Sequence, residues 1–183
     1  MREWTKQGMR TLMGAALLGL WTSGAAAQAA PRKAVDPTWL KADSITKVAE
    51  FSVVAGLTGL NGGMNFDGAK DGGLTFTVPV GWSVLLHVYN EDQTLPHSVE
   101  VIRDTQPVPI GPVPPAFPHA ETSSLSQGMS AEQKQTVRFV ADRAGKYLIF
   151  CAVPGHGAAG MWIRLIVAPD PRRPSIEESP KKS

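Results

Sequence analysis

Residues 150–162 read Phe-Cys-Ala-Val-Pro-Gly-His-Gly-Ala-Ala-Gly-Met-Trp, and this stretch decides the fold prediction. It holds the only cysteine of the 183-residue chain, Cys151, with His156 five residues later and Met161 five residues after that. A thiolate, an imidazole and a thioether are three of the donors of a trigonal copper site with a long axial sulfur. Such a site needs a second imidazole, and His97 is the candidate because it opens an expected strand. The sequence therefore predicts one copper ion per chain, with His97, Cys151, His156 and Met161 as its ligands.

The loop that carries these residues lies between two expected strands, residues 146–151 and 161–167. Alternation along the first strand places Cys151 on the face of Tyr147 and Ile149, with Leu148 and Phe150 on the other. Glycines at 155, 157 and 160 permit backbone conformations with positive φ, which would turn the ligand side chains inward. Strands of a rigid sheet then hold the donors, which suits electron transfer because the site changes little on reduction.

The rest of the chain predicts an all-β protein. Alternating or β-branched runs favour strands at residues 44–57, 74–78, 82–89, 97–102 and 135–140, with turn residues between them. The proline-rich segment 105–130 is expected to be a long connection. The fold prediction is one domain, an antiparallel Greek-key β-sandwich, over residues 44–168. An N-terminal linker at 28–43 precedes it in this prediction, and a mobile C-terminal tail at 169–183 follows it.

Residues 1–27 have the pattern of a cleaved signal peptide. Three basic residues, at positions 2, 6 and 10, precede the apolar run 11–21 and two small-residue sites, 25–27 and 27–29, so that cleavage is expected after Ala27 or Ala29. The run is shorter than the roughly 20 residues that cross a bilayer. We therefore expect export to the periplasm or the outer face of the membrane without stable membrane insertion; an uncleaved anchor is the alternative.

Cleavage of this segment would change the charge of the chain. The full chain has 18 basic and 16 acidic residues, and loss of three basic residues and Glu3 leaves a balance of zero. That balance argues against binding of nucleic acid. A single cysteine cannot form an internal disulfide, so in an exported protein it is a free thiol or a metal ligand.

Several segments resemble sulfocyanins and, more distantly, rusticyanin, both of the cupredoxin superfamily. The loop 150–162 is similar to the blue copper loop of sulfocyanins. Asn-Phe-Asp-Gly at 65–68, Val-Pro-Val-Gly-Trp at 78–82 and Leu-Pro-His-Ser at 95–98 match sulfocyanin-like segments in order. The resemblance covers residues 45–168. It implies a cupredoxin fold, electron transfer through the four ligands named above, and a hydrogen bond from Ser98 that constrains the cysteine sulfur.

The leading interpretation is a monomeric carrier of single electrons between a redox donor and a redox acceptor, which we expect to be components of a respiratory chain. A copper-delivery protein is the alternative, although the chain lacks the Met- or His-rich tracts that suit metal exchange. An enzyme is not expected, because oxidase or reductase copper centres need more than the four histidines present, and a binuclear centre needs two cysteines. His87 and His119 are expected to lie outside the site. We also expect an apolar docking patch around His156, formed by residues 157–160 and extended by residues 115–117.

Overall fold

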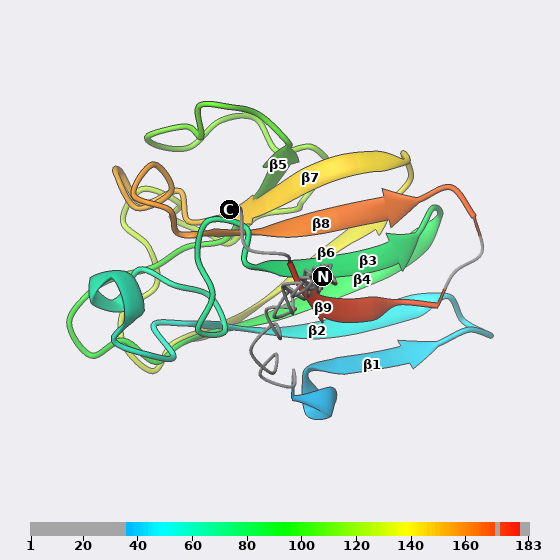
Figure 1. The fold of residues 1–183 in the computed structure, drawn as a ribbon, viewed down its shortest axis with the longest axis horizontal. Coiled ribbons are helices and arrows are strands. Elements are labelled where there is room, and N and C mark those ends of the chain that lie inside the picture. The colour runs from blue at the N-terminus through cyan, green and yellow to red at the C-terminus, as the bar shows by residue number, and fades with distance from the viewer. Residues whose placement is uncertain (1–35, 171–172, 180–183) are drawn as a thin grey trace, which may run out of the picture. The chain divides into compact units, whose positions relative to one another are not determined.

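The computed structural model describes residues 36–170 and 173–179, which belong to one compact unit. Two β-sheets form this unit (Figure 1). The first has the order β1-β2-β4-β6, from β1 (Leu40–Asp43), β2 (Val48–Ala55), β4 (Trp82–Asn90) and β6 (Lys134–Ala141). The second has the order β5-β7-β8-β3-β9, from β5 (Glu100–Arg103), β7 (Gly145–Phe150), β8 (Trp162–Ala168), β3 (Leu74–Pro79) and β9 (Ser175–Glu178). Two 3-10 turns, η1 (Pro37–Trp39) and η2 (Leu60–Gly63), complete the described elements. The predicted all-β class is confirmed.

The core lies between the sheets, as the alternation of apolar residues predicts. Burial alternates along β2, and Phe51 of that strand stacks on Phe76 of β3 with ring centroids 4.5 Å apart. On β7 the residues Tyr147 and Ile149 join this core together with Cys151, whereas Leu148 and Phe150 face a second cluster on the outer side of the sheet. The predicted face of Cys151 is therefore confirmed.

The expectation of purely antiparallel sheets is wrong. Strand β2 pairs with β4 in parallel, and β3 pairs with β8 in parallel, so both sheets are mixed. Alternation assigns the face of a residue but carries no information on the direction of the neighbouring strand. A parallel pair needs a crossover connection, and here the chain passes through β3, in the opposite sheet, on its way from β2 to β4.

Both ends of the domain extend further than we expected. Residues 40–43, placed in the linker, form β1, because Leu40 packs against the core and Asp43 caps the turn that leads into β2. Residues 175–178, placed in the mobile tail, form β9 against β3, and Ile176 packs on the core. Each strand has little apolar signal of its own. The predicted signal peptide lies outside the described residues, as do positions 28–35 of the expected linker.

The proline-rich connection, residues 105–130, covers the outer face of the second sheet. Three of its apolar residues, Val108, Val113 and Leu125, pack against the cluster that contains Phe150 and Trp162. Near its end, Met129 forms an isolated bridge with His97. The connection is therefore an ordered part of the fold that touches the predicted site.

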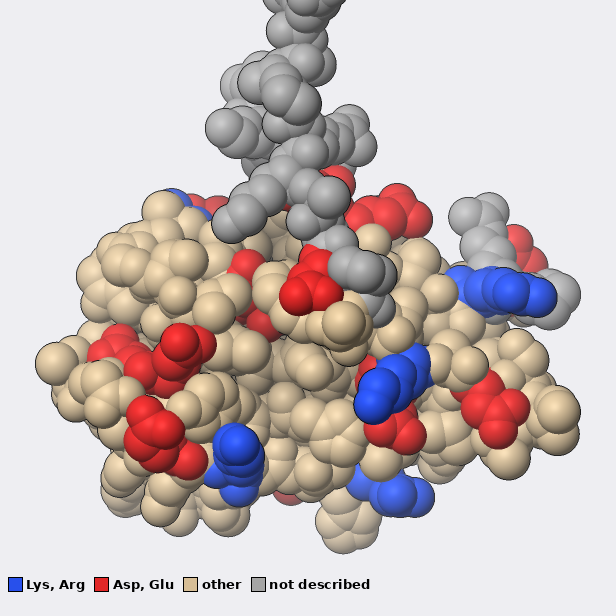
Figure 2. Space-filling view, turned by 90° about the horizontal axis from the view of Figure 1, so that it is seen from below, with Lys and Arg blue, Asp and Glu red and all other residues tan. Residues whose placement is uncertain are grey.

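In the described residues no helix has the length and apolar character needed to cross a membrane. On the face in Figure 2, Lys and Arg side chains are scattered among acidic ones. This face therefore shows no large patch of one sign of charge.

Candidate metal centre

The loop after β7 is closed by its own backbone. The amide of Cys151 donates to the carbonyl of Met161 (3.0 Å), and the amide of Met161 donates to the carbonyl of His156 (3.0 Å). Residues Gly155 and Gly160 have positive φ, as predicted. Gly157 does not; a side chain there would collide with the Phe150 ring and the Cys151 carbonyl, so this glycine serves close packing. The loop thus brings three predicted ligands to one end of β7.

His97 reaches the same place from a different segment. It lies just before β5, the strand that pairs with β7, and is 1% exposed. Its backbone exchanges two hydrogen bonds with Met129, at 2.7 and 3.1 Å. The end of the proline-rich connection therefore fixes the position of this histidine.

Three of the four predicted ligands form a compact triangle of donor atoms. The Cys151 sulfur lies 3.9 Å from Nδ1 of His97 and 3.6 Å from Nδ1 of His156, and the two nitrogens are 3.3 Å apart. They form the one group of at least three His, Cys, Asp or Glu side chains in the described chain that could hold a metal ion. A point equidistant from the three atoms lies about 2.1 Å from each, close to the metal–nitrogen and metal–sulfur bond lengths of about 2.0–2.3 Å for a first-row ion such as zinc.

The chemistry of the donor set favours copper. Two imidazoles and a thiolate match the trigonal plane of a blue copper site, in which a thioether is the weak axial ligand. Met161 ends the loop that carries Cys151 and His156, and its side chain is fully buried in the core. Its backbone carbonyl accepts a hydrogen bond from Cys151, and its amide donates one to His156. The residues present therefore fit the group that the sequence predicts.

Ser98 lies against the cysteine, where the resemblance placed it. Its amide is 3.4 Å from the Cys151 sulfur and its hydroxyl is 3.9 Å away, while the hydroxyl accepts a hydrogen bond from the amide of Ala152 (3.1 Å). Burial raises the pKa of the Cys151 thiol, and the hydrogen bonds from Ser98 and Val153 oppose that shift only in part. A bound cation would compensate the buried thiolate.

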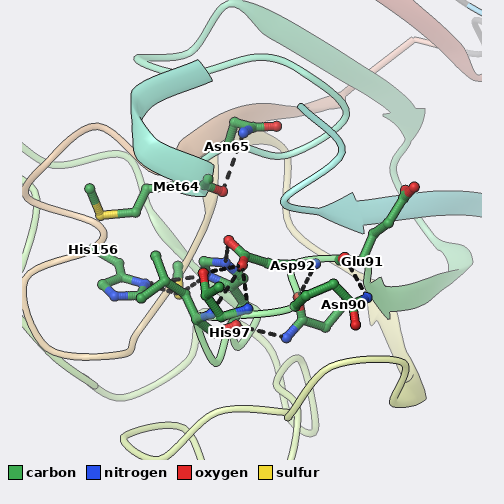
Figure 3. A network of polar contacts seen from close by, with 12 residues as sticks. Met64, Asn65, Asn90, Glu91, Asp92, His97 and His156 are labelled. Atoms are coloured by element: carbon green, nitrogen blue, oxygen red, sulfur yellow. Dashed lines mark hydrogen bonds and ion pairs between the residues drawn. The ribbon is translucent and has the colours of Figure 1, made fainter. Parts of the chain in front are cut away.

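Asp92 is a neighbour of the site that the sequence analysis missed. Its Oδ2 lies 3.3 Å from Nε2 of His97, the ring nitrogen opposite the donor triangle (Figure 3). Burial raises the pKa of Asp92, but hydrogen bonds from Thr94, Leu95 and His97 outweigh it and hold the pKa at about 2. An acidic residue in a polar loop is ordinary, so no signal in the sequence marked this one.

The two histidines are suited to bind as neutral ligands. Burial lowers the pKa of His97, and burial likewise lowers that of His156, with the negative charge of Asp92 opposing both shifts. His156 is half-buried, whereas His97 and Cys151 are buried. Access to the donor triangle from solvent is therefore through the His156 ring.

Exposed apolar residues lie on this loop and on two segments hydrogen-bonded to it. Ala158 and Ala159 are exposed. Ile110 is 70% exposed, and its carbonyl accepts a hydrogen bond from Gly155 (2.7 Å). Leu60, in η2, is 42% exposed. The residue after it, Asn61, donates a side-chain hydrogen bond to the carbonyl of Ala159, which holds η2 beside the ligand loop.

The expected extension of this patch through residues 115–117 is wrong. Phe117 is buried against Phe139 and Tyr147 in the core. The carbonyl of Ala116 accepts a hydrogen bond from Arg143 in the turn between β6 and β7, at the end of β7 opposite Cys151. We call the observed set, Leu60, Ile110, Ala158 and Ala159, the apolar rim.

The remaining histidines lie apart from the donor triangle. His87 is in β4, where its ring contacts Glu50 (3.1 Å) and Thr136 (3.2 Å) on the first sheet. His119 is exposed in the proline-rich connection. Neither belongs to the group of possible metal ligands.

Comparison with known proteins points to one family. A family model described as the sulfocyanin (SoxE) domain matches residues 37–175. A curated sulfocyanin from Sulfolobus acidocaldarius is 28% identical over 115 residues, which cover 57% of this chain and 55% of that protein. The match thus spans about half the length of the curated relative.

Solved structures share the fold. A rusticyanin mutant has a TM-score of 0.55 at 21% identity, covering 71% of this chain and 87% of that chain. Rusticyanin from Thiobacillus ferrooxidans has a TM-score of 0.51 at 22% identity, covering 71% of this chain and 86% of that chain. These likenesses establish the architecture, whereas the ligand geometry given above comes from the structure of this chain itself.

Proposed function

This chain belongs to the sulfocyanin (SoxE) domain family, and from that premise we propose that it is a blue copper electron carrier. The proposed ligands are His97, Cys151, His156 and Met161, with one copper ion per chain. The observation that carries the proposal is the triangle of one sulfur and two nitrogens, whose sides of 3.3–3.9 Å fit a single first-row metal ion.

When bound, copper supplies a one-electron couple between Cu(I) and Cu(II). The residues of the chain would restrict movement of the donor atoms during that exchange. Cys151 is held by the hydrogen bond from its amide to the carbonyl of Met161, and His97 by the pair of backbone hydrogen bonds with Met129; both side chains are shielded from water. The amide of Ser98 points at the sulfur and limits its movement. Such restraint of the donor atoms suits electron transfer rather than catalysis on a bound substrate.

We further propose that electrons enter and leave through the His156 ring. This ring is the half-buried member of the triangle, and the apolar rim lies on its loop and on two segments bonded to that loop. A neutral, apolar contact of small area suits short encounters with a redox partner. The partners in this proposal are a donor and an acceptor of a respiratory chain, met by a monomeric, exported protein after removal of residues 1–27.

Delivery of copper to another protein is the second candidate function, because the same ligands could release Cu(I). Buried ligands on two segments argue against easy release. The two functions differ in what happens to the metal after reduction, and this difference is measurable.

The test is repeated reduction and oxidation of the copper-loaded chain in the presence of a Cu(I) chelator. Ascorbate and ferricyanide drive the cycles, and the thiolate-to-copper absorption reports the oxidised site. We expect the absorption to return fully over ten cycles with little chelated copper. Loss of the metal to the chelator on the first reduction would favour delivery instead.

A further inference from the structure

Asp92 is built into the wall of the donor triangle. Its side chain is 9% exposed, and its two oxygens have separate partners. Oδ1 accepts hydrogen bonds from the amide of Thr94 (2.8 Å), the hydroxyl of Thr94 (2.8 Å) and the amide of Leu95 (3.0 Å). Oδ2 is left to face Nε2 of His97 at 3.3 Å. The loop therefore fixes one oxygen and aims the other at the histidine.

The backbone closes around this carboxylate. A side chain on Gly63 would collide with Oδ2 of Asp92, and Gly63 has a positive φ that favours glycine. A side chain on Gly56 would collide with the Cβ of Asp92. The segments that contain Gly56 and Gly63 therefore pack directly against the side chain of Asp92, and neither has room for a Cβ atom there. Figure 3 shows Asp92 between His97 and the segment that carries Met64 and Asn65.

The contact with Asp92 determines which ring nitrogen of His97 carries the proton. A carboxylate accepts hydrogen bonds and does not donate them, so Nε2 must be the protonated nitrogen of the neutral ring. Nδ1 then presents its lone pair toward Cys151 and His156. A partner of this kind on a metal-binding histidine fixes both the tautomer and the ring orientation.

We propose that Asp92 is a positioning residue that holds His97 in its Nε2-protonated tautomer and that its negative charge lowers the reduction potential of the site. This inference rests on the proposed copper function and deepens it. With the carboxylate counted, the oxidised site of Cu(II), thiolate and carboxylate is neutral, whereas the reduced site has a charge of −1. A buried environment disfavours the charged state. Asp92 therefore opposes the rise in potential that apolar surroundings and a thioether ligand would give.

The test compares Asp92→Asn with a matched control, Asp43→Asn. Asp43 caps a turn in the same way, through the amides of Ile45 and Thr46 and the hydroxyl of Thr46, but contacts no histidine. Asparagine retains an oxygen that can accept from Nε2 and removes the charge. We expect Asp92→Asn to keep the thiolate absorption and to lower the preference for Cu(II) about tenfold, which raises the potential by about 59 mV. Asp43→Asn should leave the potential unchanged.

An unchanged potential in Asp92→Asn, with a loss of stability like that of Asp43→Asn, would reduce Asp92 to a turn cap and overturn the proposal. A second measurement does not depend on folding of the variant or on copper. In the copper-free wild-type chain, 15N NMR should show His97 as the Nε2-protonated tautomer, and the Nδ1-protonated form would refute the positioning role. Absence of any thiolate-to-copper band in the wild type would instead refute the proposed function.

Discussion

At the scale of single residues, Gly157 sets how closely the ligand loop packs on β7. A Cβ at this position would lie 2.6 Å from the Phe150 ring and 2.9 Å from the Cys151 carbonyl. Overpacking of this kind costs about 1–3 kcal/mol. We expect Gly157→Ala to lower the free energy of unfolding by that amount and to perturb the thiolate absorption, measured by urea unfolding and visible spectroscopy. Gly111→Ala, at a glycine with open space around it, is the control and should be silent.

Ala158 tests the apolar rim. A glutamate at this exposed position places a charge beside the His156 loop without touching the donor atoms. We expect Ala158→Glu to slow electron self-exchange between oxidised and reduced copies at least tenfold, measured by NMR line broadening, with the copper spectrum unchanged. Ala144→Glu, at a residue that is also exposed and lies in the turn between β6 and β7, is the control. Equal self-exchange rates in the two variants would show that the apolar rim is not the contact surface for electron transfer.

The residues that sequence reasoning could find are those whose spacing has a chemical meaning. Cys151, His156 and Met161 are close in sequence and share a loop rich in glycine, so their chemistry is readable together. Asp92 is different, because its role depends on a contact with His97 that exists only after Gly56 and Gly63 close around it.

At the scale of elements, a buried glutamate in β5 lies beside a half-buried glutamate of the proline-rich connection. Glu100 in β5 is fully buried; its Oε2 accepts a hydrogen bond from the amide of Val113 (3.4 Å), and its Oε1 has no partner. Glu121 bridges to the same residue and has one buried oxygen without a partner. Burial, reinforced by the charge of Glu121 and opposed by the Val113 hydrogen bond, raises the pKa of Glu100 to about 7.

Because the pKa of Glu100 is raised, the free energy of unfolding falls as pH rises. The folded-state pKa of about 7 exceeds the ordinary value of 4.5, so the contribution of Glu100 is fully present below about pH 4.5 and is lost as pH rises through 7. Glu100→Gln mimics the protonated form. We expect the stability advantage of the copper-free variant over the wild type to grow by about 2–3 kcal/mol between pH 5 and pH 8, measured by urea unfolding. The exposed control, Glu91→Gln, should show no such divergence, and an E100Q advantage equal at both pH values would contradict the account.

Strand β9 forms the edge of the second sheet farthest from the ligand-bearing strands. It adds Ile176 to the core and pairs with β3 over four residues. We expect truncation after Asp170 to lower the free energy of unfolding by about 1–3 kcal/mol, because an isoleucine and a strand pairing are lost. The copper spectrum should not change, since β5 and β7 lie at the other side of the sheet order. Truncation after Ser179 is the control; a matching loss there would exclude β9 as the cause.

The strands that could be predicted from the sequence are those with several alternating apolar residues, such as β2, β3 and β6. Strands β1 and β9 each bring one residue to the core, Leu40 and Ile176. A single apolar residue gives no alternating pattern in the sequence. Each strand forms because it pairs with the edge of a neighbouring strand, β1 with β2 and β9 with β3. Strand direction was also beyond prediction, because it is set by the order in which the chain visits the two sheets.

At the scale of the whole molecule, the fold explains why the site combines distant segments. The donor triangle draws on the start of the β5 segment and the loop between β7 and β8. The antiparallel β5–β7 and β7–β8 pairs place these segments side by side in one sheet. The proline-rich connection covers the outer face of that sheet and reaches the site at Ile110 and Met129. The sequence indicates that this segment is long. That it packs over β5 and β7 could not be predicted, because this packing involves residues far apart in the chain.

The measurement that tests the central claim most directly is a titration of residues 28–183 with Cu(II), followed by visible absorption and EPR. We expect an intense thiolate-to-copper band that saturates at one equivalent, with narrow hyperfine splitting, and that ascorbate bleaches reversibly. The band should vanish in Cys151→Ser and persist in His87→Ala and His119→Ala, whose histidines lie outside the triangle. A colourless adduct, or a band that survives loss of the Cys151 sulfur, would contradict the proposed copper site.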